Sequence, residues 1–449
     1  MERALSRRVA LPRKRVRYAL ILRPLDAISR GAINGSVAGV TLELAKRLAA
    51  DHDVTVYAPR RHGQAAAEEF SPCLRVRRIR GTLRKAHKYL GMLGSILQDV
   101  PPHFLSRYFF LEYYAQIALD LARHRPDIVH VQQHPQIGPL VRRLCPSAKL
   151  VLHLHGDVIA RAPSRVARRL LAPFQVIVTC SQYVTAETAS ALPDLAARLF
   201  TVGNGVDIRS FQLPERTADA DSPTKLLYVG RLSPEKGPHL LLDAFNRVAE
   251  RRRRASLDLI GPAQTFSFSA VKLLASGDPW GTSLCEFYGR TALERLRREL
   301  ADFREFYLRH LRSIQSPTAA AATRFLGGMS HAETLRHYAT ADIVVVPSVH
   351  ESFGIPIVEA MAAGLPVVAT RSGGIPGIVQ HERTGLLVSR NDPQAMADAI
   401  VALLDDPDRR RALGRAGRAR VESLFTWDHA VQRLSATLAL NPPAPDAHG

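Results

Sequence analysis

Cysteine is scarce in this chain, and its few residues stand far apart. The 449 residues include four cysteines, none of which belongs to a CxxC pair or has histidine partners at zinc-binding spacing. A disulfide framework and a zinc-ribbon domain are therefore excluded as organising features. We expect free, buried thiols in a reducing cytoplasm, at Cys73, Cys145, Cys180 and Cys285.

Long apolar runs are also missing. No stretch reaches the roughly 18 consecutive apolar residues that a membrane-spanning helix requires. The start of the chain is basic and contains neither an apolar segment nor a small-residue cleavage site, so we expect no secretory signal. The sequence predicts a cytoplasmic protein.

Acidic residues are outnumbered by basic ones. Lys and Arg total 61 against 41 Asp and Glu, a formal net charge of +20. This excess favours acidic partners such as nucleotide phosphates, nucleic acid or an anionic membrane, and coding bias toward alanine and arginine explains it equally well. Residues 1–14 form a basic arm that suits peripheral contact with the inner membrane face or, alternatively, a solvated tail. Nucleic-acid binding is a distant alternative, because the chain lacks the signatures of such domains.

Short β-branched runs alternate with helical stretches along the whole chain. This alternation predicts an α/β fold with parallel sheets, divided into two domains. A helix is also expected over residues 107–124, ending before Pro126. The candidate strands are residues 15–24, 52–59, 126–132, 148–156 and 174–181 in the first half and 224–230, 256–261, 341–348, 365–370 and 384–389 in the second.

An insertion interrupts the second half at residues 262–324. Its apolar residues recur at helical spacing, which predicts one helix with an aromatic cluster of its own. We favour a subdomain that buries these aromatics over a surface that binds the acceptor or a partner. The helical positions are Leu293, Leu296, Leu300, Phe303 and Tyr307.

Glycine-rich and basic turns follow two of the strands. Gly31, Gly35 and Gly39 precede or open a helix, an arrangement typical of phosphate binding and also of a merely tight turn. The loop is not GxGxxG, so a dinucleotide-dependent oxidoreductase is not indicated. In VGRLSPEKG, Arg231 and Lys236 flank a Ser-Pro turn and are suited to clamp a diphosphate, although isolated cations are more often solvated.

Two carboxylates mark the third element, HESFGIPIVEAMAAG. Glu351 precedes a turn whose backbone N–H groups can bind an anion, and Glu359 lies eight residues further on, inside a helix. Paired carboxylates first indicate a glycosidase or phosphorylase. Because one lies on a loop and one in a helix beside glycine-rich turns, recognition of hydroxyl groups fits better than hydrolysis.

Four ordered motifs together resemble the family-4 retaining glycosyltransferases of GT-B fold. They are VGNGVD at 202–207, VGRLSPEKG at 229–237, the Glu351–Glu359 pair and SGGIPGIVQHERTGLLV at 372–388. The resemblance implies two Rossmann-like domains facing across a cleft, with the donor in the C-terminal domain. The expected boundaries are an N-terminal acceptor-side domain at 15–207, a linker at 208–224, a C-terminal domain at 225–404, helices returning to the first domain at 405–438 and a tail at 439–449.

The resemblance also implies roles for individual residues. Glu359 would hold the ribose hydroxyls and Glu351 those of the donor sugar, while Arg231 and Lys236 would neutralise the diphosphate. His155 would reach the transferred sugar from the other domain, with His153 as the alternative. The remaining donor-binding positions are Gly35 in the first loop, Ser352, Phe353, Gly354 and Ile355 in the anion-binding turn, and Gly327 to Met329 beside the base.

The implied reaction is transfer of a sugar from a nucleotide-sugar to an acceptor hydroxyl with retention, without a side-chain base. No DxD pair follows a strand, so we expect neither metal nor cofactor, the nucleotide-sugar being a co-substrate. The composition is typical of bacteria and favours an acceptor in cell-envelope polysaccharide or glycolipid biosynthesis. The alternative acceptor is a soluble small molecule, such as an antibiotic or another secondary metabolite core.

Overall fold

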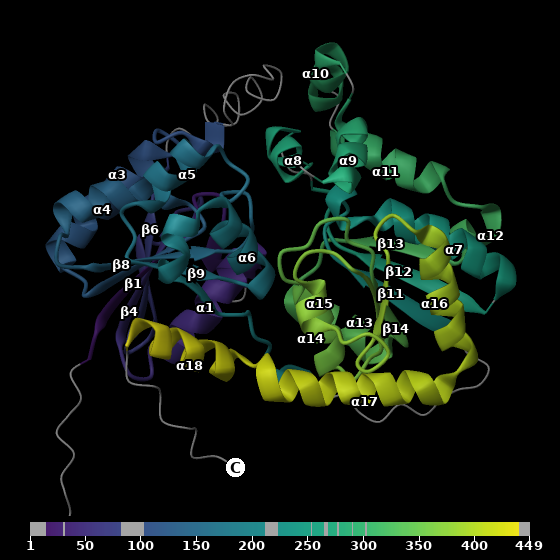
Figure 1. Cartoon of the computed structure of the whole chain (residues 1–449). Helices are drawn as coiled ribbons and strands as arrows, with labels where there is room; N and C mark the ends of the chain where they lie inside the picture. The colour runs from purple at the N-terminus through teal and green to yellow at the C-terminus, as the bar shows by residue number, and fades with distance from the viewer. Residues whose placement is uncertain are drawn as a thin grey trace, which may run out of the picture.

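The computed structural model comprises two α/β domains placed side by side (Figure 1). It describes residues 15–29, 32–81, 103–211, 223–252, 254–264, 268–275, 278–289, 291–300 and 303–439. The basic arm at 1–14, Gly31, most of the expected linker and nearly all of the tail lie outside the described residues.

The N-terminal domain is built on an eight-stranded sheet with the order β10-β9-β8-β7-β1-β4-β6-β5. All neighbouring strands are parallel except the β5–β6 pair, which is antiparallel. The strands are β1 (Arg17–Ile21), β4 (Asp53–Pro59), β5 (Ala67–Ser71), β6 (Leu74–Ile79), β7 (Ile128–Gln132), β8 (Lys149–Leu154), β9 (Val176–Thr179) and β10 (Leu199–Thr201).

Helices cover both faces of this sheet, as parallel strands require. The expected helix at 107–124 is confirmed as α3, shortened at its start because Phe110 adopts a left-handed conformation. A small hairpin of β2 (Ala27–Ser29) and β3 (Ala32–Asn34) leads into the first helix. The helices are α1 (Ser36–Leu48), α3 (Leu111–His124), α4 (Gly138–Leu144), α5 (Ser164–Leu171) and α6 (Gln182–Ala191).

The C-terminal domain contains a six-stranded sheet, β13-β12-β11-β14-β15-β16, in which every pair is parallel. The strands are β11 (Thr224–Val229), β12 (Ala255–Ile260), β13 (Thr323–Gly327), β14 (Ile343–Val346), β15 (Val367–Thr370) and β16 (Leu386–Val388). The helices are α7 (Pro238–Arg251), α13 (His331–Thr340), α14 (Ile355–Ala362), α15 (Ile375–Ile378) and α16 (Pro393–Asp405).

The insertion forms a helical layer over one end of this domain. The single helix expected through Leu293 and Tyr307 is wrong: α10 ends at Leu300 and α11 begins at Phe303. The same apolar spacing runs through both helices, so periodicity could not reveal the junction, and Leu293 is exposed. The helices are α8 (Phe268–Ala275), α9 (Pro279–Tyr288), α10 (Ala292–Leu300), α11 (Phe303–Ser313) and α12 (Pro317–Ala321).

The expected aromatic cluster exists and is tied to the rest of the domain. Tyr288 stacks on Phe303 at 4.5 Å between ring centroids, and Tyr307 is fully buried. The Tyr307 hydroxyl lies 2.8 Å from Nδ1 of His239 on α7. The insertion therefore shares the hydrophobic core of its domain.

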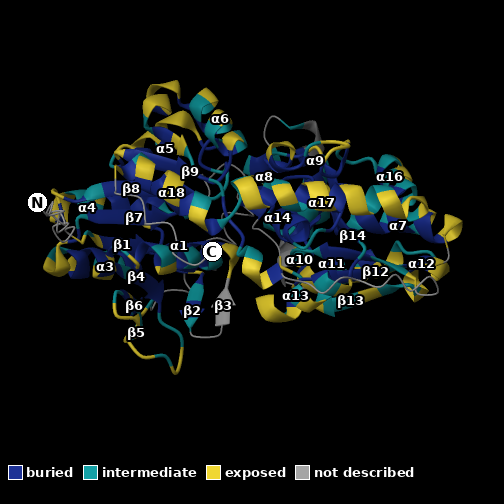
Figure 2. Cartoon of the chain, turned by 90° about the horizontal axis from the view of Figure 1, so that it is seen from below, coloured by how far each residue is buried: buried dark blue, intermediate teal, exposed yellow. Residues whose placement is uncertain are grey.

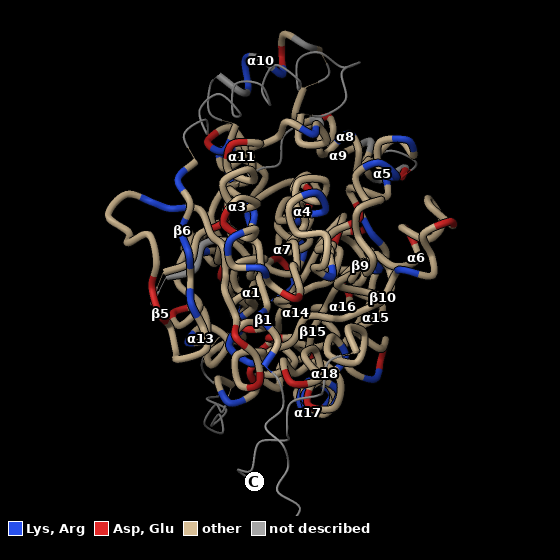
Figure 3. The backbone as a smooth tube through the Cα atoms, turned by 90° about the vertical axis from the view of Figure 1, so that its left-hand side faces the viewer, with Lys and Arg blue, Asp and Glu red and all other residues tan. Residues whose placement is uncertain are grey.

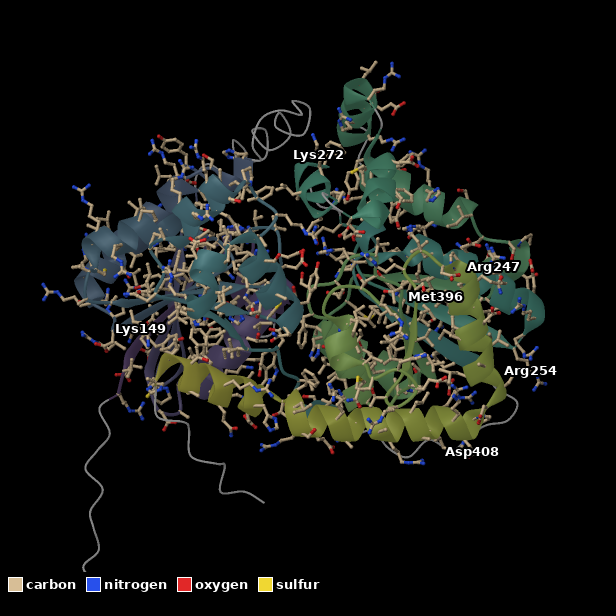
Figure 4. All side chains as sticks on the ribbon, in the orientation of Figure 1. Lys149, Arg247, Arg254, Lys272, Met396 and Asp408 are labelled. Carbon is tan, nitrogen blue, oxygen red and sulfur yellow. The ribbon has the colours of Figure 1, made fainter. Side chains whose placement is uncertain are left out.

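The last two helices connect the domains from below (Figure 2). The first, α17 (Pro407–Leu424), packs along the C-terminal domain, and α18 (Trp427–Leu438) packs beside α1 of the N-terminal domain. Trp427 and Leu434 belong to the hydrophobic core of the N-terminal domain. Lys149, labelled in Figure 4, donates a 3.0 Å hydrogen bond to the carbonyl of Leu438.

Three further expectations concern cysteine, membranes and charge. The four thiols are free, but Cys73 and Cys285 are only half-buried, so the expectation of full burial is wrong for these two. Among the described residues, no helix combines the length and apolarity needed to cross a membrane. On the side seen in Figure 3, basic positions are interspersed with acidic ones rather than gathered in one patch.

Candidate functional site

The site begins where neighbouring parallel strands of the C-terminal domain end. Strands β11 and β14 are adjacent, so the loops that follow them meet at the carboxyl edge of the sheet, where α/β proteins bind ligands. Two glycines make this close packing feasible. A Cβ at Gly237 would overlap the carbonyl of Pro347, and one at Gly261 would overlap that of Gly230.

The two cations of this edge are held in ion pairs. Nζ of Lys236 lies 2.7 Å from Oε2 of Glu351, and Arg231 lies 2.9 Å from Oε1 of Glu235. Their side chains are only 22% and 26% exposed, so the alternative of solvated surface cations is wrong. Burial disfavours ionised Glu351, but Lys236 outweighs this effect and holds the pKa of the carboxyl below its usual value.

The turn after Glu351 leads directly into α14. Gly354 adopts a positive φ of 115° at the start of the helix, and no side chain caps its first N–H groups. Such a helix terminus carries partial positive charge and attracts anions. The turn is supported by Gly373 and Gly374, where added Cβ atoms would overlap the carbonyls of Glu351 and Ser352.

Two residues of the turn have side chains with structural roles. The Phe353 ring is 5% exposed and packs against Gly203 and, at 6.2 Å between centroids, Phe425. Ile355 packs against the hydrophobic cores of both domains. Any contact of these two residues with a ligand therefore falls to the backbone.

Glu359 points from α14 toward α13. Its carboxylate accepts a 2.9 Å hydrogen bond from the Tyr338 hydroxyl and lies 3.0 Å from Nε2 of His331. This hydrogen bond raises the pKa of His331 above its usual value. Gly327, with φ of 72°, ends β13 and is followed by half-buried Met329 just before α13.

His331 and Tyr338 are site residues that sequence reasoning missed. Both follow Gly327 to Met329, the positions expected beside the base, within the segment FLGGMSHAETLRHY. Their spacing of seven residues on a helix places both on one face, which was the available signal.

The opposite side of the site comes from the N-terminal domain. His155 follows the end of β8; its Nε2 lies 2.8 Å from Oε1 of Gln132, and its backbone N–H donates to Oε1 of Gln133 at 2.6 Å. An amide oxygen only accepts hydrogen bonds, so Nε2 carries the proton and Nδ1 is the acceptor. Gln133 adopts a positive φ of 65°, a strained conformation for a residue other than glycine.

The structure distinguishes His155 from its alternative, His153. His153 is 1% exposed, stacks on His155 at 4.3 Å and has no hydrogen-bond partner at either ring nitrogen. His130 stacks on its other side at 5.5 Å. Burial, followed by the neighbouring His153, Arg23 and His130, holds the pKa of His155 well below its usual value. His155 is therefore neutral and lies at the accessible end of the stack.

Gly35 lies at the start of α1, near the same edge. Its φ is 101°, and a Cβ there would lie 2.5 Å from Oδ1 of Asp26. Asp26 in turn binds Arg23 at 2.7 Å, and Arg23 is close enough to influence His155. Gly35 thus belongs to the His155 side, apart from the other positions expected to bind the donor.

The two sides meet. The Ser181 hydroxyl donates a 2.5 Å hydrogen bond to the Ser352 carbonyl, and a Cβ at Gly156 would lie 3.3 Å from Oγ of Ser352. His155 and Glu351 therefore occupy facing loops. Among the described residues, no three His, Cys, Asp or Glu side chains are grouped as metal ligands.

Two largely parallel sheets whose carboxyl edges face each other, one with cations held by glutamates and the other with a neutral histidine, are the arrangement of the GT-B class. Family models agree: Glycosyltransferase Family 4 matches residues 37–210, and Glycosyl transferases group 1 matches residues 211–277 and 311–420. The chain belongs to this family and is a family-4 glycosyltransferase.

Individual relatives extend the comparison. The chain is 30% identical to the lipopolysaccharide 1,2-N-acetylglucosaminetransferase of Salmonella typhimurium over 316 residues, 69% of this chain and 71% of that protein. It is 28% identical to the GDP-mannose-dependent alpha-(1-6)-phosphatidylinositol monomannoside mannosyltransferase of Mycobacterium tuberculosis, covering 86% and 89%. The structure of Anabaena Alr3699/HepE in complex with UDP-glucose superposes with a TM-score of 0.62 at 20% identity, covering 94% and 99% of the two chains.

Proposed function

We propose that this enzyme transfers a sugar from a nucleotide-sugar to an acceptor hydroxyl with retention of anomeric configuration. The observation that carries the proposal is the Lys236–Glu351 pair beside the uncapped start of α14, facing the loop of His155. The relatives support it, because one is named as GDP-mannose-dependent and a structural neighbour was solved with UDP-glucose.

The cations act on the leaving group. As the sugar–phosphate bond breaks, negative charge grows on the departing diphosphate, and preorganised donors stabilise that charge without rearrangement. Arg231, Lys236 and the backbone N–H groups of Gly354 and Ile355 at the start of α14 supply these donors. When the diphosphate replaces Glu351 as the partner of Lys236, the carboxylate becomes available to accept hydroxyl groups of the donor sugar.

The nucleoside is held one helix away. Glu359 accepts the ribose hydroxyls, with Tyr338 and His331 holding its carboxylate in place. The base lies against the backbone of Gly327 to Met329.

On the other side, neutral His155 offers Nδ1 as an acceptor to the transferred sugar. Transfer by this route needs no side-chain base, metal or cofactor, because the leaving phosphate accepts the proton of the acceptor hydroxyl while the new bond forms on the same face. The acceptor we propose belongs to envelope polysaccharide or glycolipid synthesis, in line with the lipopolysaccharide and phosphatidylinositol substrates that the names of two relatives contain.

A panel of UDP-, GDP-, ADP- and dTDP-sugars tests the donor, with release of nucleoside diphosphate as the readout. Release from one donor should be lost in Arg231→Ala and Glu359→Ala and kept in Arg415→Ala, whose side chain is exposed on α17. The anomeric configuration of the product, read by NMR coupling constants, tests retention. If calorimetry detects no binding of any nucleoside diphosphate, the donor site is wrongly assigned.

A further inference from the structure

A buried hydrogen bond joins the two domains directly beside the site. Nε2 of His350, from the C-terminal domain, lies 2.9 Å from Oδ1 of Asp157, from the N-terminal domain. The two side chains are 10% and 0% exposed. A buried carboxylate of this kind requires partners, because removing either member of such a pair leaves an uncompensated polar group.

Asp157 is firmly held on its own domain. Its Oδ2 binds Nε of Arg161 at 2.7 Å and accepts a 3.1 Å hydrogen bond from the Tyr183 hydroxyl. Arg161 also pairs with Glu187 at 3.1 Å. Burial disfavours ionised Asp157, but His350 and Arg161 outweigh this and keep the pKa of the carboxyl well below its usual value. The carboxylate therefore presents a fixed charged acceptor to His350.

His350 is tied to the C-terminal domain through its backbone. Its backbone N–H donates to the carbonyl of Glu235 at 3.1 Å, and that residue also binds Arg231. Its ring also makes an edge contact, at 6.4 Å between centroids, with Tyr183 of the N-terminal domain, so this contact crosses the same boundary as the bond to Asp157. If the domains separated, each residue would stay with its own domain and the hydrogen bond between them would break.

Both residues of the contact lie next to a candidate site residue in the chain. Asp157 stands two residues after His155, and His350 immediately precedes Glu351. One hydrogen bond thus sets the distance between the loop that carries His155 and the loop that carries Glu351. The mechanism proposed above requires these two loops to address the same sugar.

We propose that Asp157 and His350 are positioning residues, which hold the two loops in register so that His155 faces the sugar bound by Glu351. The inference rests on the proposed function for the roles of His155 and Glu351. The pair touches neither substrate; it acts through the loops that do. Ser181 and Ser352 add a second hydrogen bond across the same boundary, at 2.5 Å.

The first test replaces the hydrogen-bond donor while keeping an aromatic ring. His350→Phe should lower kcat by roughly 10- to 100-fold, since a small misplacement of reacting groups has effects of that size. Affinity for the nucleoside diphosphate should change less than about twofold, because the residues that bind it lie within one domain. His350→Gln, whose amide can donate to Asp157, should recover part of the loss. The matched control is Asp194→Asn, which removes a half-exposed carboxylate paired with Arg168 and should leave kcat unchanged.

The second test is a double-mutant cycle with Asp157→Asn. If the two residues act as one unit, the double variant should be no slower than the slower single variant. Independent losses, or an equal loss of nucleotide affinity in His350→Phe, would overturn the inference. Small-angle scattering gives a readout free of activity: both variants should have a larger radius of gyration than the wild type with nucleotide bound.

These outcomes separate the inference from the proposed function. A wild type that binds no nucleotide would refute the donor site. A wild type that binds and transfers normally, with His350→Phe equal to it in kcat and in radius of gyration, would refute only the positioning pair.

Discussion

The two facing edges of the molecule are built from the same kind of sheet and differ in their electrostatics. At the C-terminal edge, charges occur as close pairs: Lys236 with Glu351, Arg231 with Glu235, and His331 with Glu359. At the N-terminal edge, His155 is neutral and hydrogen bonded to the amide of Gln132, and the charge nearest to it in the chain, Asp157, is paired with Arg161. The difference indicates that the two edges suit different parts of a nucleotide-sugar. The ion-paired cations suit a diphosphate, and the neutral histidine suits sugar hydroxyls.

The largest expected effect comes from breaking the charged edge. Lys236→Ala removes the cation that the proposed mechanism places at the leaving group and leaves Glu351 without its partner, so kcat for nucleoside diphosphate release should fall by about 10²- to 10³-fold. Steady-state kinetics measure this. Lys225→Ala, near the start of β11 and away from the loop that carries Lys236, is the control and should retain the wild-type rate. An equal loss in both variants would mean damage to the fold.

A smaller effect is expected at Glu359, the residue proposed to bind the ribose. Glu359→Gln weakens charge-assisted hydrogen bonds of about 1.5–3 kcal/mol, so the KM for the donor should rise roughly 10- to 100-fold, with kcat affected less. Exposed Glu382→Gln serves as the control. A loss confined to kcat would contradict ribose recognition by Glu359.

The buried histidine stack of the N-terminal domain predicts that acid lowers the stability of the folded protein. Burial lowers the pKa of His153 to about 3. Below about pH 6.5 this histidine therefore binds a proton in the unfolded chain and stays unprotonated in the folded protein. Stability should therefore drop between pH 7 and pH 5, and His153→Phe should reduce that drop. Thermal unfolding at the two pH values measures it; an unchanged pH dependence would contradict a neutral His153.

The smallest effect is expected at His331. Its contribution to stability changes with pH in the direction opposite to that of His153. Glu359 raises the pKa of this histidine, so its contribution to stability is complete below the unfolded value of about 6.5 and disappears as the pH rises through the folded value. The difference in Tm between wild type and His331→Gln should therefore shrink as the pH is raised from 6 to 9. A difference that grows with pH would refute the ion pair.

Much of the fold could be predicted because local patterns carry it. The ten candidate strands correspond to β1, β4, β7, β8 and β9 in the first domain and to β11, β12, β14, β15 and β16 in the second. The hairpin of β5 and β6 was missed because the edge strand β5, AEEFS, is largely polar and β6, LRVRRI, contains three arginines. Short edge strands such as β10 and β13 were missed because pairing rather than composition defines them.

The site was predictable to the extent that its residues follow strands in recognisable motifs. Arg231, Lys236, Glu351 and Glu359 could be singled out from their spacing and their resemblance to a known family. The pairing of Lys236 with Glu351 could not, since their 115-residue separation is bridged only by the adjacency of two strands.

The sequence by itself determined the alternation of strands and helices, the position of the insertion and the motifs of a family-4 glycosyltransferase, because apolar periodicity and turn chemistry are local properties. Only the tertiary structure decided which histidine lies at the accessible end of the stack and which carboxylate forms an ion pair with which cation. It also decided that Asp157 contacts His350 across the two domains. These are contacts between residues far apart in the chain, and burial determines both their partners and their charge states.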